Sequence, residues 1–244
     1  MIWRMTETTN QYGQPVGPSL PDWTPRPRPP RVFLEGRYCR LEPLDPARHA
    51  ADLFAANNEA PDGRLWTYLP TEPFAAFDSY RDWLDRMAVS EDPLFFALCD
   101  RADGKAAGLA AYLRIDPSMG SIEVGHLNFS PRLQKTRAAT EAQFLLADNA
   151  LATSGYRRYE WKCDSLNEPS RAAARRLGFT FEGVFRQAVV YKGRSRDTAW
   201  FSITDREWPA IRQAYLDWLA PENFDAEGHQ RRKLSTLIES YSST

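Results

Sequence analysis

Residues 130–185 read SPRLQKTRAATEAQFLLADNALATSGYRRYEWKCDSLNEPSRAAARRLGFTFEGVF, and two features of this stretch decide the fold. The first is the turn 134–139, which leads into a segment whose apolar residues recur at the spacing of a helix. Such a helix start presents unpaired backbone N–H groups and the positive end of a dipole, which together suit a pyrophosphate group. The second is a short helix that Asn167 caps and Gly178 ends before a strand.

A longer motif spans this second helix and the strand after it: Asn167-x-x-Ser170, then Leu177-Gly178-Phe179, then Glu182-Gly183. With RDTAWFSI at 196–203, the motif resembles the GNAT superfamily of N-acetyltransferases, in the branch related to the RimJ/RimL ribosomal-protein acetyltransferases. The resemblance covers roughly residues 31–205. It implies a mixed, mostly antiparallel central sheet flanked by helices, in the order β-α-α-β-β-β-α-β-α-β-β. Periodicity alone indicates only a mixed α/β (α+β) protein.

The periodicity and the turn signals also place the individual elements along the chain. We expect strands at about 32–44, 94–99, 106–115, 121–129, 158–163, 179–191 and 196–204, and helices at about 46–59, 77–90, 138–153, 167–177 and 205–219. The short turns between the second, third and fourth strands predict an antiparallel meander.

The resemblance implies acetyl-CoA as a substrate and indicates which residues bind it. In the family the fourth strand splays from its neighbour, so that Leu127, Asn128 and Phe129 would face the pantetheine arm here; the alternative is an ordinary buried strand. The turn would bind the pyrophosphate through Gln134, Lys135, Thr136, Arg137, Ala138 and Ala139. The family usually has glycine where Arg137 stands, and we expect this arginine to supply side-chain charge to the phosphates.

Asn167 and Ser170 match two residues with roles in the family. The resemblance implies that Asn167 hydrogen-bonds the coenzyme arm and that Ser170 protonates the departing thiolate. Both residues also have a structural explanation, because Asn167 is an N-cap and Ser170 would lie at the third position of the helix. Capping explains the asparagine but does not require a serine at position 170.

The chain also departs from the family at the position of the general base. RimL-like enzymes place a glutamate seven residues beyond the glutamate of the Glu-Gly pair, and Val189 occupies that position here. Glu123 is our preferred replacement, His126 is the second candidate, and Tyr191 lies further away. A carboxylate on a strand among apolar neighbours would have a raised pKa that suits it to deprotonating an ammonium group.

Strict alternation along the strand places Glu123 and His126 on opposite faces of the sheet unless a bulge intervenes. The alternative role for Glu123 is a cross-strand ion pair with Arg114 or Lys192. The alternative for His126 is a satisfied histidine within the strand.

Two further segments could shape the acceptor site. Trp66 and Tyr68 lie in a loop between the first two helices, in the region that sets acceptor specificity in the family; loop packing is the alternative. Arg186 and the turn 192–194 fit a solvated hairpin tip better than a clamp for an acidic substrate.

Composition restricts the possible functions. The chain has 244 residues and a formal net charge of -1, so it lacks the basic character that sequence-independent binding to nucleic acid requires. Its three cysteines are odd in number and lie in apolar runs, which favours buried free thiols in a reducing compartment. No spacing of cysteine and histidine suggests a metal site. No apolar run reaches the ~18 residues of a membrane span, and residues 1–10 lack the pattern of a leader, so we expect a cytoplasmic protein.

We divide the chain into three parts. Residues 1–30 form a proline-rich tail, which is either passive or an arm that wraps a partner subunit, with Trp23 as anchor in a possible homodimer. Residues 31–205 form the acetyltransferase-like domain. Residues 206–244 form a C-terminal helical extension, whose last part is either a docking helix or a frayed end.

These features predict an acetyl-CoA-dependent N-acetyltransferase that transfers the acetyl group directly to a primary amine. The resemblance favours the α-amino group of a ribosomal or other protein as acceptor. Two alternatives stay open: an enzyme that acetylates a small amine, such as a polyamine or an antibiotic-like molecule, and a non-catalytic acyl-CoA-binding protein.

Overall fold

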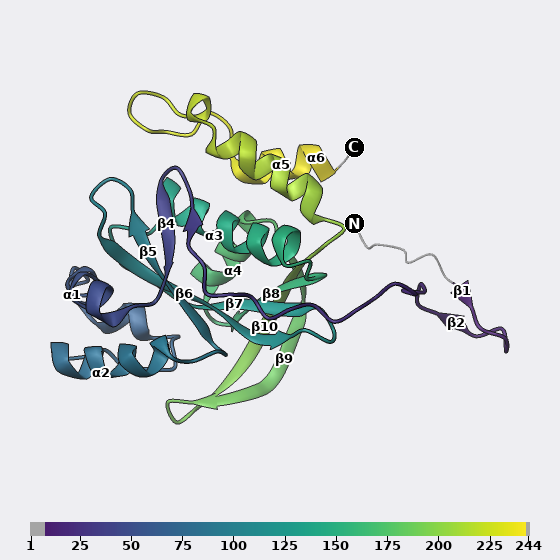
Figure 1. Cartoon of the computed structure of the whole chain (residues 1–244), viewed down its shortest axis with the longest axis horizontal. Coiled ribbons are helices and arrows are strands. Elements are labelled where there is room, and N and C mark those ends of the chain that lie inside the picture. The colour runs from purple at the N-terminus through teal and green to yellow at the C-terminus, as the bar shows by residue number, and fades with distance from the viewer. Residues whose placement is uncertain (1–7, 243–244) are drawn as a thin grey trace.

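The computed structural model describes residues 8–242, and its centre is one sheet of eight strands (Figure 1). The spatial order is β3-β4-β5-β6-β7-β8-β10-β9, and every neighbouring pair is antiparallel except β7 and β8, which are parallel. The strands are β3 (Leu34–Glu35), β4 (Cys39–Pro43), β5 (Leu94–Asp100), β6 (Ala106–Asp116), β7 (Ser121–Phe129), β8 (Arg158–Asp164), β9 (Thr180–Tyr191) and β10 (Arg194–Thr204).

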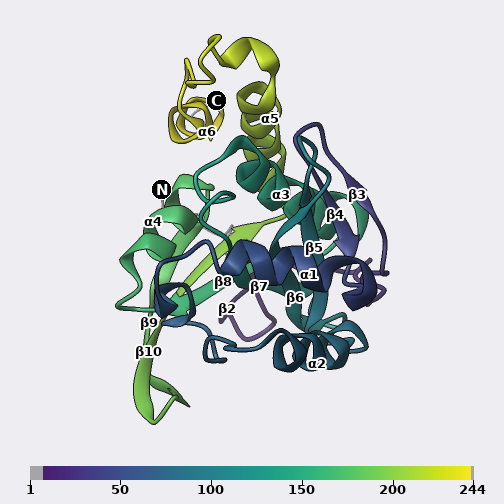
Figure 2. The same cartoon turned by 90° about the vertical axis from the view of Figure 1, so that its left-hand side faces the viewer.

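Helices cover the two faces of the sheet unequally (Figures 1 and 2). The helices are α1 (Pro46–Asn57), α2 (Phe77–Ala88), α3 (Arg137–Asp148), α4 (Glu168–Arg176), α5 (Trp208–Leu219) and α6 (Leu234–Ser242). The first two helices pack on β5 and β6 around one apolar core, and α3 to α6 enclose a second core on the opposite face. The predicted fold class and order of elements are therefore confirmed.

The strand expected at 32–44 is wrong in one respect, because the chain turns within it. Residues 36–38 separate β3 from β4, and the two short strands form a hairpin. The buried carboxylate of Glu141 on α3 causes this turn: it accepts hydrogen bonds from the backbone N–H groups of Arg37 (2.8 Å), Tyr38 (2.6 Å) and Cys39 (2.8 Å). A Cβ atom at Gly36 would overlap the same carboxylate, so glycine permits the close approach.

The C-terminal extension packs against the rest of the chain. Leu234 and Leu237 of α6 are fully buried in the core that α3 contributes to, which excludes a frayed end for this segment. Gly178 ends α4 with a φ of +93°, and a side chain there would press on Ile211 of α5 and Ile238 of α6. Helix α5 starts three residues later than expected, because the Glu207 carboxylate accepts a hydrogen bond from the Thr204 N–H group (2.7 Å) and closes a turn.

The N-terminal arm is anchored to its own chain. The Trp23 indole N–H group donates to the Ser118 carbonyl oxygen (2.9 Å), and its ring covers Gly120 in the turn between β6 and β7. Further along, the Tyr156 hydroxyl donates to the Pro27 carbonyl oxygen (3.1 Å). Trp23, predicted as an anchor on a partner subunit, therefore packs on its own chain. The small hairpin of β1 (Thr8–Thr9) and β2 (Pro15–Val16) extends away from the body (Figure 1). Residues 1–7 lie outside the described residues. The predicted homodimer stays a prediction.

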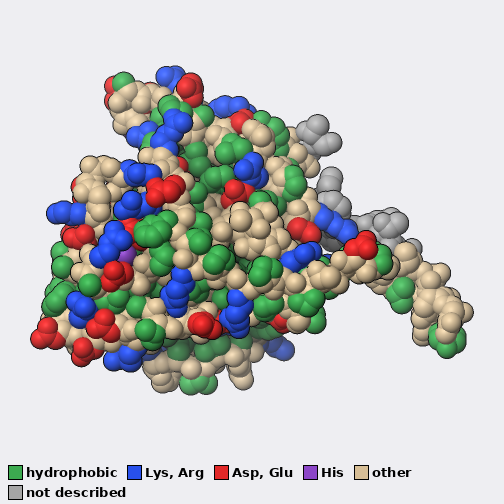
Figure 3. Space-filling view, viewed as in Figure 1, with side chains coloured by type: hydrophobic (Ala, Val, Ile, Leu, Met, Phe, Trp, Pro, Cys, Tyr) green, Lys and Arg blue, Asp and Glu red, His purple; other side chains and the backbone are tan. Residues whose placement is uncertain are grey.

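Positive and negative side chains are interspersed over the face shown in Figure 3, in keeping with the nearly balanced charge of the chain. Within residues 8–242, no helix has the length and apolar character needed to cross a bilayer.

Candidate active site

The sheet opens between its two parallel strands. The β7–β8 ladder joins residues 121–124 to residues 158–161 and ends at the pair Val124 and Trp161, beyond which the strands separate. A cleft of about 1870 Å³ occupies this opening. Its walls come from α3 and α4 on one face of the sheet, and from the loop 64–70 and the β9–β10 hairpin on the other. The cleft therefore connects the two faces of the sheet.

The start of α3 faces this cleft. Thr136 is the N-cap of α3: its hydroxyl oxygen accepts from the Ala139 N–H group (3.1 Å) and its hydroxyl group donates to the Leu133 carbonyl oxygen (2.7 Å). The Gln134 amide donates to the Phe129 carbonyl oxygen (2.8 Å), which closes the turn between β7 and α3. The remaining N–H groups of the first turn have no acceptor within the helix, so this end can bind an anion.

Arg137, the first residue of α3, lines the cleft between two aromatic rings. Its guanidinium carbon lies 4.9 Å from the ring centre of Tyr38 and 4.6 Å from that of Phe224 in the C-terminal extension. These cation–π contacts hold the charge beside the helix start, where a glycine would supply none.

We expect the substitution Arg137→Glu to weaken acetyl-CoA binding by roughly 1.5–3 kcal/mol, because it places an anion beside the pyrophosphate and removes a charge-assisted hydrogen bond. Isothermal titration calorimetry measures the change. Arg132→Glu is the matched control, because Arg132 pairs with Asp103 and Glu59 outside the cleft. Unchanged affinity in the Arg137 variant would remove this residue from the coenzyme site.

Asn167 and Ser170 begin α4 on the other side of the opening, and both line the cleft. The Asn167 amide oxygen accepts from the Ser170 N–H group (3.2 Å), so the predicted helix cap is present. The Trp161 indole N–H group donates to the Ser170 hydroxyl oxygen (3.0 Å). This bond occupies an acceptor site of the hydroxyl group, so its proton can be donated to the neighbouring Cys163 sulfur or to a group in the cleft.

Strand β7 contains a bulge that brings Glu123 and His126 to the same face. Gly125 lies opposite Ala111 and Asn128 lies opposite Leu109, so two residues of β7 fit opposite one residue of β6. His126 has a φ of +50°, and its ring packs against Phe95 (5.1 Å between ring centres) in the core beneath α1 and α2. Glu123 shares this face, since it lies two residues before Gly125 in regular pairing. The opposite orientations expected from strict alternation do not occur.

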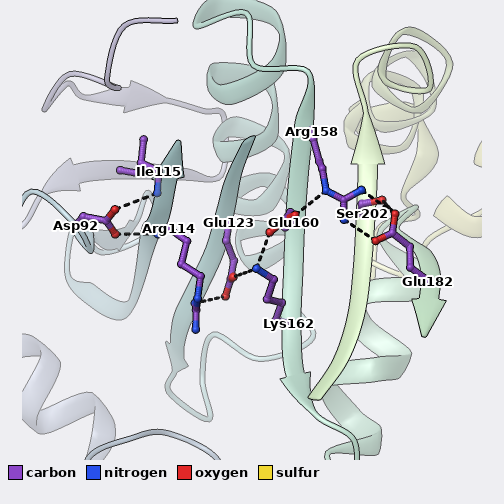
Figure 4. Close-up of polar contacts among 9 residues, drawn as sticks. All are labelled: Asp92, Arg114, Ile115, Glu123, Arg158, Glu160, Lys162, Glu182 and Ser202. Carbon is purple, nitrogen blue, oxygen red and sulfur yellow. Dashed lines mark hydrogen bonds and ion pairs between the residues drawn. The ribbon is translucent and has the colours of Figure 1, made fainter. Parts of the chain in front are cut away.

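Glu123 lies where the two strands begin to separate, near the Arg114 end of a row of ion pairs that continues to Glu182 (Figure 4). Its carboxylate, which is 3% exposed, lies 2.9 Å from Arg114 Nη1 and 3.0 Å from Lys162 Nζ. Lys162 also pairs with Glu160 (2.6 Å), which in turn pairs with Arg158 (2.6 Å). The expected ion pair with Arg114 is thus present. The one with Lys192 is not, because Lys192 donates to the Trp66 carbonyl oxygen (2.7 Å).

Burial raises the pKa of Glu123 above its ordinary value, although Lys162 and Arg114 oppose this shift. The pKa of His126 is lowered by burial and by the nearby Arg114, so its imidazole is a weaker base. Tyr191 donates to the Asp164 carboxylate (2.9 Å), and burial together with this bond raises its pKa to about 12. Of these three groups, Glu123 is therefore the best suited to accept a proton near neutral pH. Val189 lines the same cleft but cannot do so.

The structure brings most of the predicted site residues into this cleft. Those that line it are Glu123, His126, Leu127, Phe129, Gln134, Lys135, Thr136, Arg137, Ala139, Asn167 and Ser170. Asn128 and Ala138 are buried and do not line it. In the predicted acceptor region Tyr68 lines the cleft, whereas Trp66 is packed in the core beneath α1 and α2. The hairpin tip is solvated as expected at Arg186, Gly193 and Arg194, whereas the side chain of Lys192 is docked on Trp66.

Sequence reasoning missed several residues of the cleft. Lys162 lies between two carboxylates, and its ammonium group is 3.7 Å from the ring centre of Trp200. The alternation of polar and apolar residues in β8 could have predicted its place on the polar face of that strand. Gln143 and Arg176, and residues 227–230 of the C-terminal extension, also line the cleft. No local motif marks these positions.

The three cysteines are buried free thiols, as expected. Cys163 is the one that lines the cleft, and burial raises its pKa, so it is a poor nucleophile. Cys99 lies in the core beneath α1 and α2, outside the cleft, beside Glu42 and His49 in an arrangement that could hold a metal ion. The Glu42 carboxylate already pairs with Arg48 (2.8 Å), and burial raises the pKa of Cys99 to about 12, so we assign this cluster a structural role.

Comparison with known proteins agrees with this geometry. Residues 39–180 match the family described as "Acetyltransferase (GNAT) domain". A GCN5-related N-acetyltransferase from Brucella melitensis, of known crystal structure, is 51% identical with a TM-score of 0.89, over 90% of this chain and 100% of that one. The chain belongs to the GNAT acetyltransferase family. It is an acyltransferase that uses acetyl-CoA as the acyl donor.

Two other relatives are more distant. YdaF of Bacillus subtilis (strain 168), named as a candidate ribosomal N-acetyltransferase, is 27% identical over 69% of this chain and 90% of its own length. The microcin C7 self-immunity acetyltransferase MccE, solved in complex with acetyl-CoA and AMP, has a TM-score of 0.61 and is 22% identical over 69% of this chain and 93% of that one. The second likeness concerns the fold alone.

Proposed function

We propose that this GNAT acetyltransferase belongs to the RimJ/RimL-like branch and acetylates the α-amino group of a protein, with Glu123 as general base and Ser170 as proton donor. The observation that carries the proposal is the position of Glu123, a buried carboxylate of raised pKa at the point where β7 and β8 separate. The similarity to YdaF supports the choice of a protein acceptor.

The coenzyme enters from the face of α3 and α4. Its pyrophosphate binds the N–H groups at the start of α3, and the side chain of Arg137 lies beside it. The pantetheine arm follows Leu127 and Phe129 toward the opening, and the Asn167 amide NH₂ group donates to it. The thioester then lies near Ser170 at the start of α4.

The acceptor enters from the opposite face, where the loop 64–70, Tyr191 and Glu123 line the cleft. Glu123 takes a proton from the ammonium group, and the neutral amine attacks the thioester carbonyl carbon. The carbon–sulfur bond then breaks, and Ser170 delivers a proton to the thiolate and recovers one from solvent. The amine loses its second proton to solvent and Glu123 releases the proton that it took, so the products are an amide, free coenzyme A and one proton.

Transfer is direct, without an acyl-enzyme. The one cysteine that lines the cleft, Cys163, is buried and has a raised pKa, so its thiolate is scarce. The amine therefore has to meet the thioester in a ternary complex.

We expect the substitution Ser170→Ala to lower turnover partially, with little change in coenzyme affinity or melting temperature. The loss is partial because water can also protonate a thiolate whose parent thiol has a pKa of about 8.5. Helix capping by Asn167 uses the backbone N–H group of Ser170, which alanine retains. A lower melting temperature with wild-type turnover would show that the hydroxyl group acts only in folding, through its bond to Trp161.

An acceptor panel tests the proposed function. The purified protein is incubated with acetyl-CoA and three sets of molecules: peptides with a free α-amino group, the same peptides with blocked N-termini but free lysines, and small polyamines. Release of free coenzyme A and the mass of the products are measured. We expect acetylation of the first set. Acetylation of polyamines alone would identify a small-molecule enzyme, and coenzyme binding without any transfer would identify a non-catalytic protein.

A further inference from the structure

We propose that the C-terminal extension, together with α3 and α4, forms a binding site for the adenine nucleotide of coenzyme A, and that the Gln143 amide recognises the adenine base. The proposal rests on the coenzyme placement given above. It concerns a part of the cleft beyond the pyrophosphate, on the side away from Glu123. Residues 181–244, which include the whole extension, lie outside the stretch that matches the GNAT family.

The first observation is the composition of this end of the cleft. Trp218 and Phe224 contribute aromatic side chains, and residues 227–230 continue the same wall. Arg176 of α4 lines the opposite side: its guanidinium group donates to the Thr140 hydroxyl oxygen (2.7 Å) and lies 5.8 Å from the ring centre of Trp218. Aromatic surfaces together with arginine are suited to a purine base and its phosphates.

The second observation is a polar side chain without a partner. Gln143 lies one helical turn beyond Ala139 and is only 4% exposed, yet it lines the cleft. No group among residues 8–242 lies within hydrogen-bond distance of its amide oxygen or its amide nitrogen. A buried amide in this condition destabilises the free protein. A ligand that offers both a donor and an acceptor would satisfy it.

The place of Gln143 identifies that ligand. The start of α3 fixes the pyrophosphate at one end of the helix, and the pantetheine arm leads from there toward Ser170 and Glu123. The adenine nucleotide extends from the pyrophosphate in the direction opposite to the pantetheine arm. A glutamine amide can bond adenine in a bidentate manner, accepting from its amino group and donating to a ring nitrogen. Gln143 therefore has the chemistry that the base requires.

Calorimetry with three ligands tests the role of Gln143. They are acetyl-CoA, acetyl-CoA carrying 1,N6-ethenoadenine, which lacks the free amino group, and S-acetyl-4′-phosphopantetheine, which lacks the nucleotide. We expect Gln143→Met to weaken acetyl-CoA binding about tenfold, to abolish the preference over the etheno form, and to leave phosphopantetheine affinity unchanged. The melting temperature of the free variant should not fall, since methionine removes an unsatisfied amide. Gln213→Met, on the exposed face of α5, is the matched control.

Hydrogen–deuterium exchange on the wild-type protein gives a second test that needs no variant. Acetyl-CoA should slow amide exchange in residues 218–230, and acetyl-phosphopantetheine should not. Equal protection by both ligands, or a Gln143→Met variant that melts lower and binds acetyl-CoA normally, would overturn the assignment. If Arg137→Glu weakens the binding of both acetyl-CoA and acetyl-phosphopantetheine while Gln143→Met weakens the binding of neither, the coenzyme placement stands and the nucleotide site alone is wrong.

Discussion

Replacing Glu123 with glutamine is expected to lower kcat by a factor of ~10² to 10⁴ while acetyl-CoA affinity stays at the wild-type value. Glutamine keeps the shape of the side chain and one oxygen that can accept from either Arg114 or Lys162, whereas the other cation loses its carboxylate oxygen. It cannot take a proton from the acceptor. Steady-state kinetics with an acceptor from the panel, combined with calorimetry, separates the two effects.

The pH dependence follows from the same group. Glu123 must be ionised to act as base, so activity falls as the pH falls through its pKa. Because burial raises that pKa, the acidic limb of kcat/KM should lie above the range of an ordinary glutamate. The substitution Glu123→Gln should abolish this limb.

Glu160→Gln is the matched control, because this carboxylate belongs to the same row of ion pairs but does not line the cleft. It should change turnover only a few-fold and keep the acidic limb. Full activity in Glu123→Gln, with loss in His126→Ala, would transfer the role of base to the histidine.

The substitution Glu141→Ala is expected to destabilise the protein by roughly 3–5 kcal/mol. The buried carboxylate accepts from three consecutive backbone N–H groups in the turn between β3 and β4, and alanine would leave all three without an acceptor. For a chain of this size, the change corresponds to a fall of about 10 °C in melting temperature.

Thermal unfolding measures this effect, with Glu168→Ala as control. Glu168 is an exposed carboxylate that pairs with Arg171 and Arg175 on the surface of α4, so its removal should cost about 1 kcal/mol or less. Equal melting temperatures in the two variants would show that the turn does not depend on Glu141.

Much of the fold could be predicted from the sequence because its signals are local. Asn167 and Gly178 fix the ends of α4, and the turn 134–139 marks the start of α3 within one residue. The break between β3 and β4 could not be predicted, because it is made by Glu141, which is about a hundred residues further along the chain. The docking of α6 likewise depends on tertiary packing.

The candidate site divides in the same way. The two segments of the proposed coenzyme site carry local motifs, so the position of Thr136, Asn167 and Ser170 in the cleft could be predicted from the sequence. The relation of Glu123 to His126 depends on a bulge that strict alternation cannot show. The unsatisfied amide of Gln143 could not be predicted, because its burial depends on tertiary packing and no spacing in the sequence links it to the C-terminal extension.

A crystal structure of the protein with coenzyme A and a peptide bearing a free N-terminus tests the central assignment most directly. We expect the pyrophosphate within hydrogen-bond distance of the N–H groups at the start of α3, the sulfur beside the Ser170 hydroxyl group, and the peptide amine within direct or single-water reach of Glu123. A coenzyme that lies outside the opening between β7 and β8, or an amine that reaches the thioester from the α3 face with Glu123 out of reach, would contradict it.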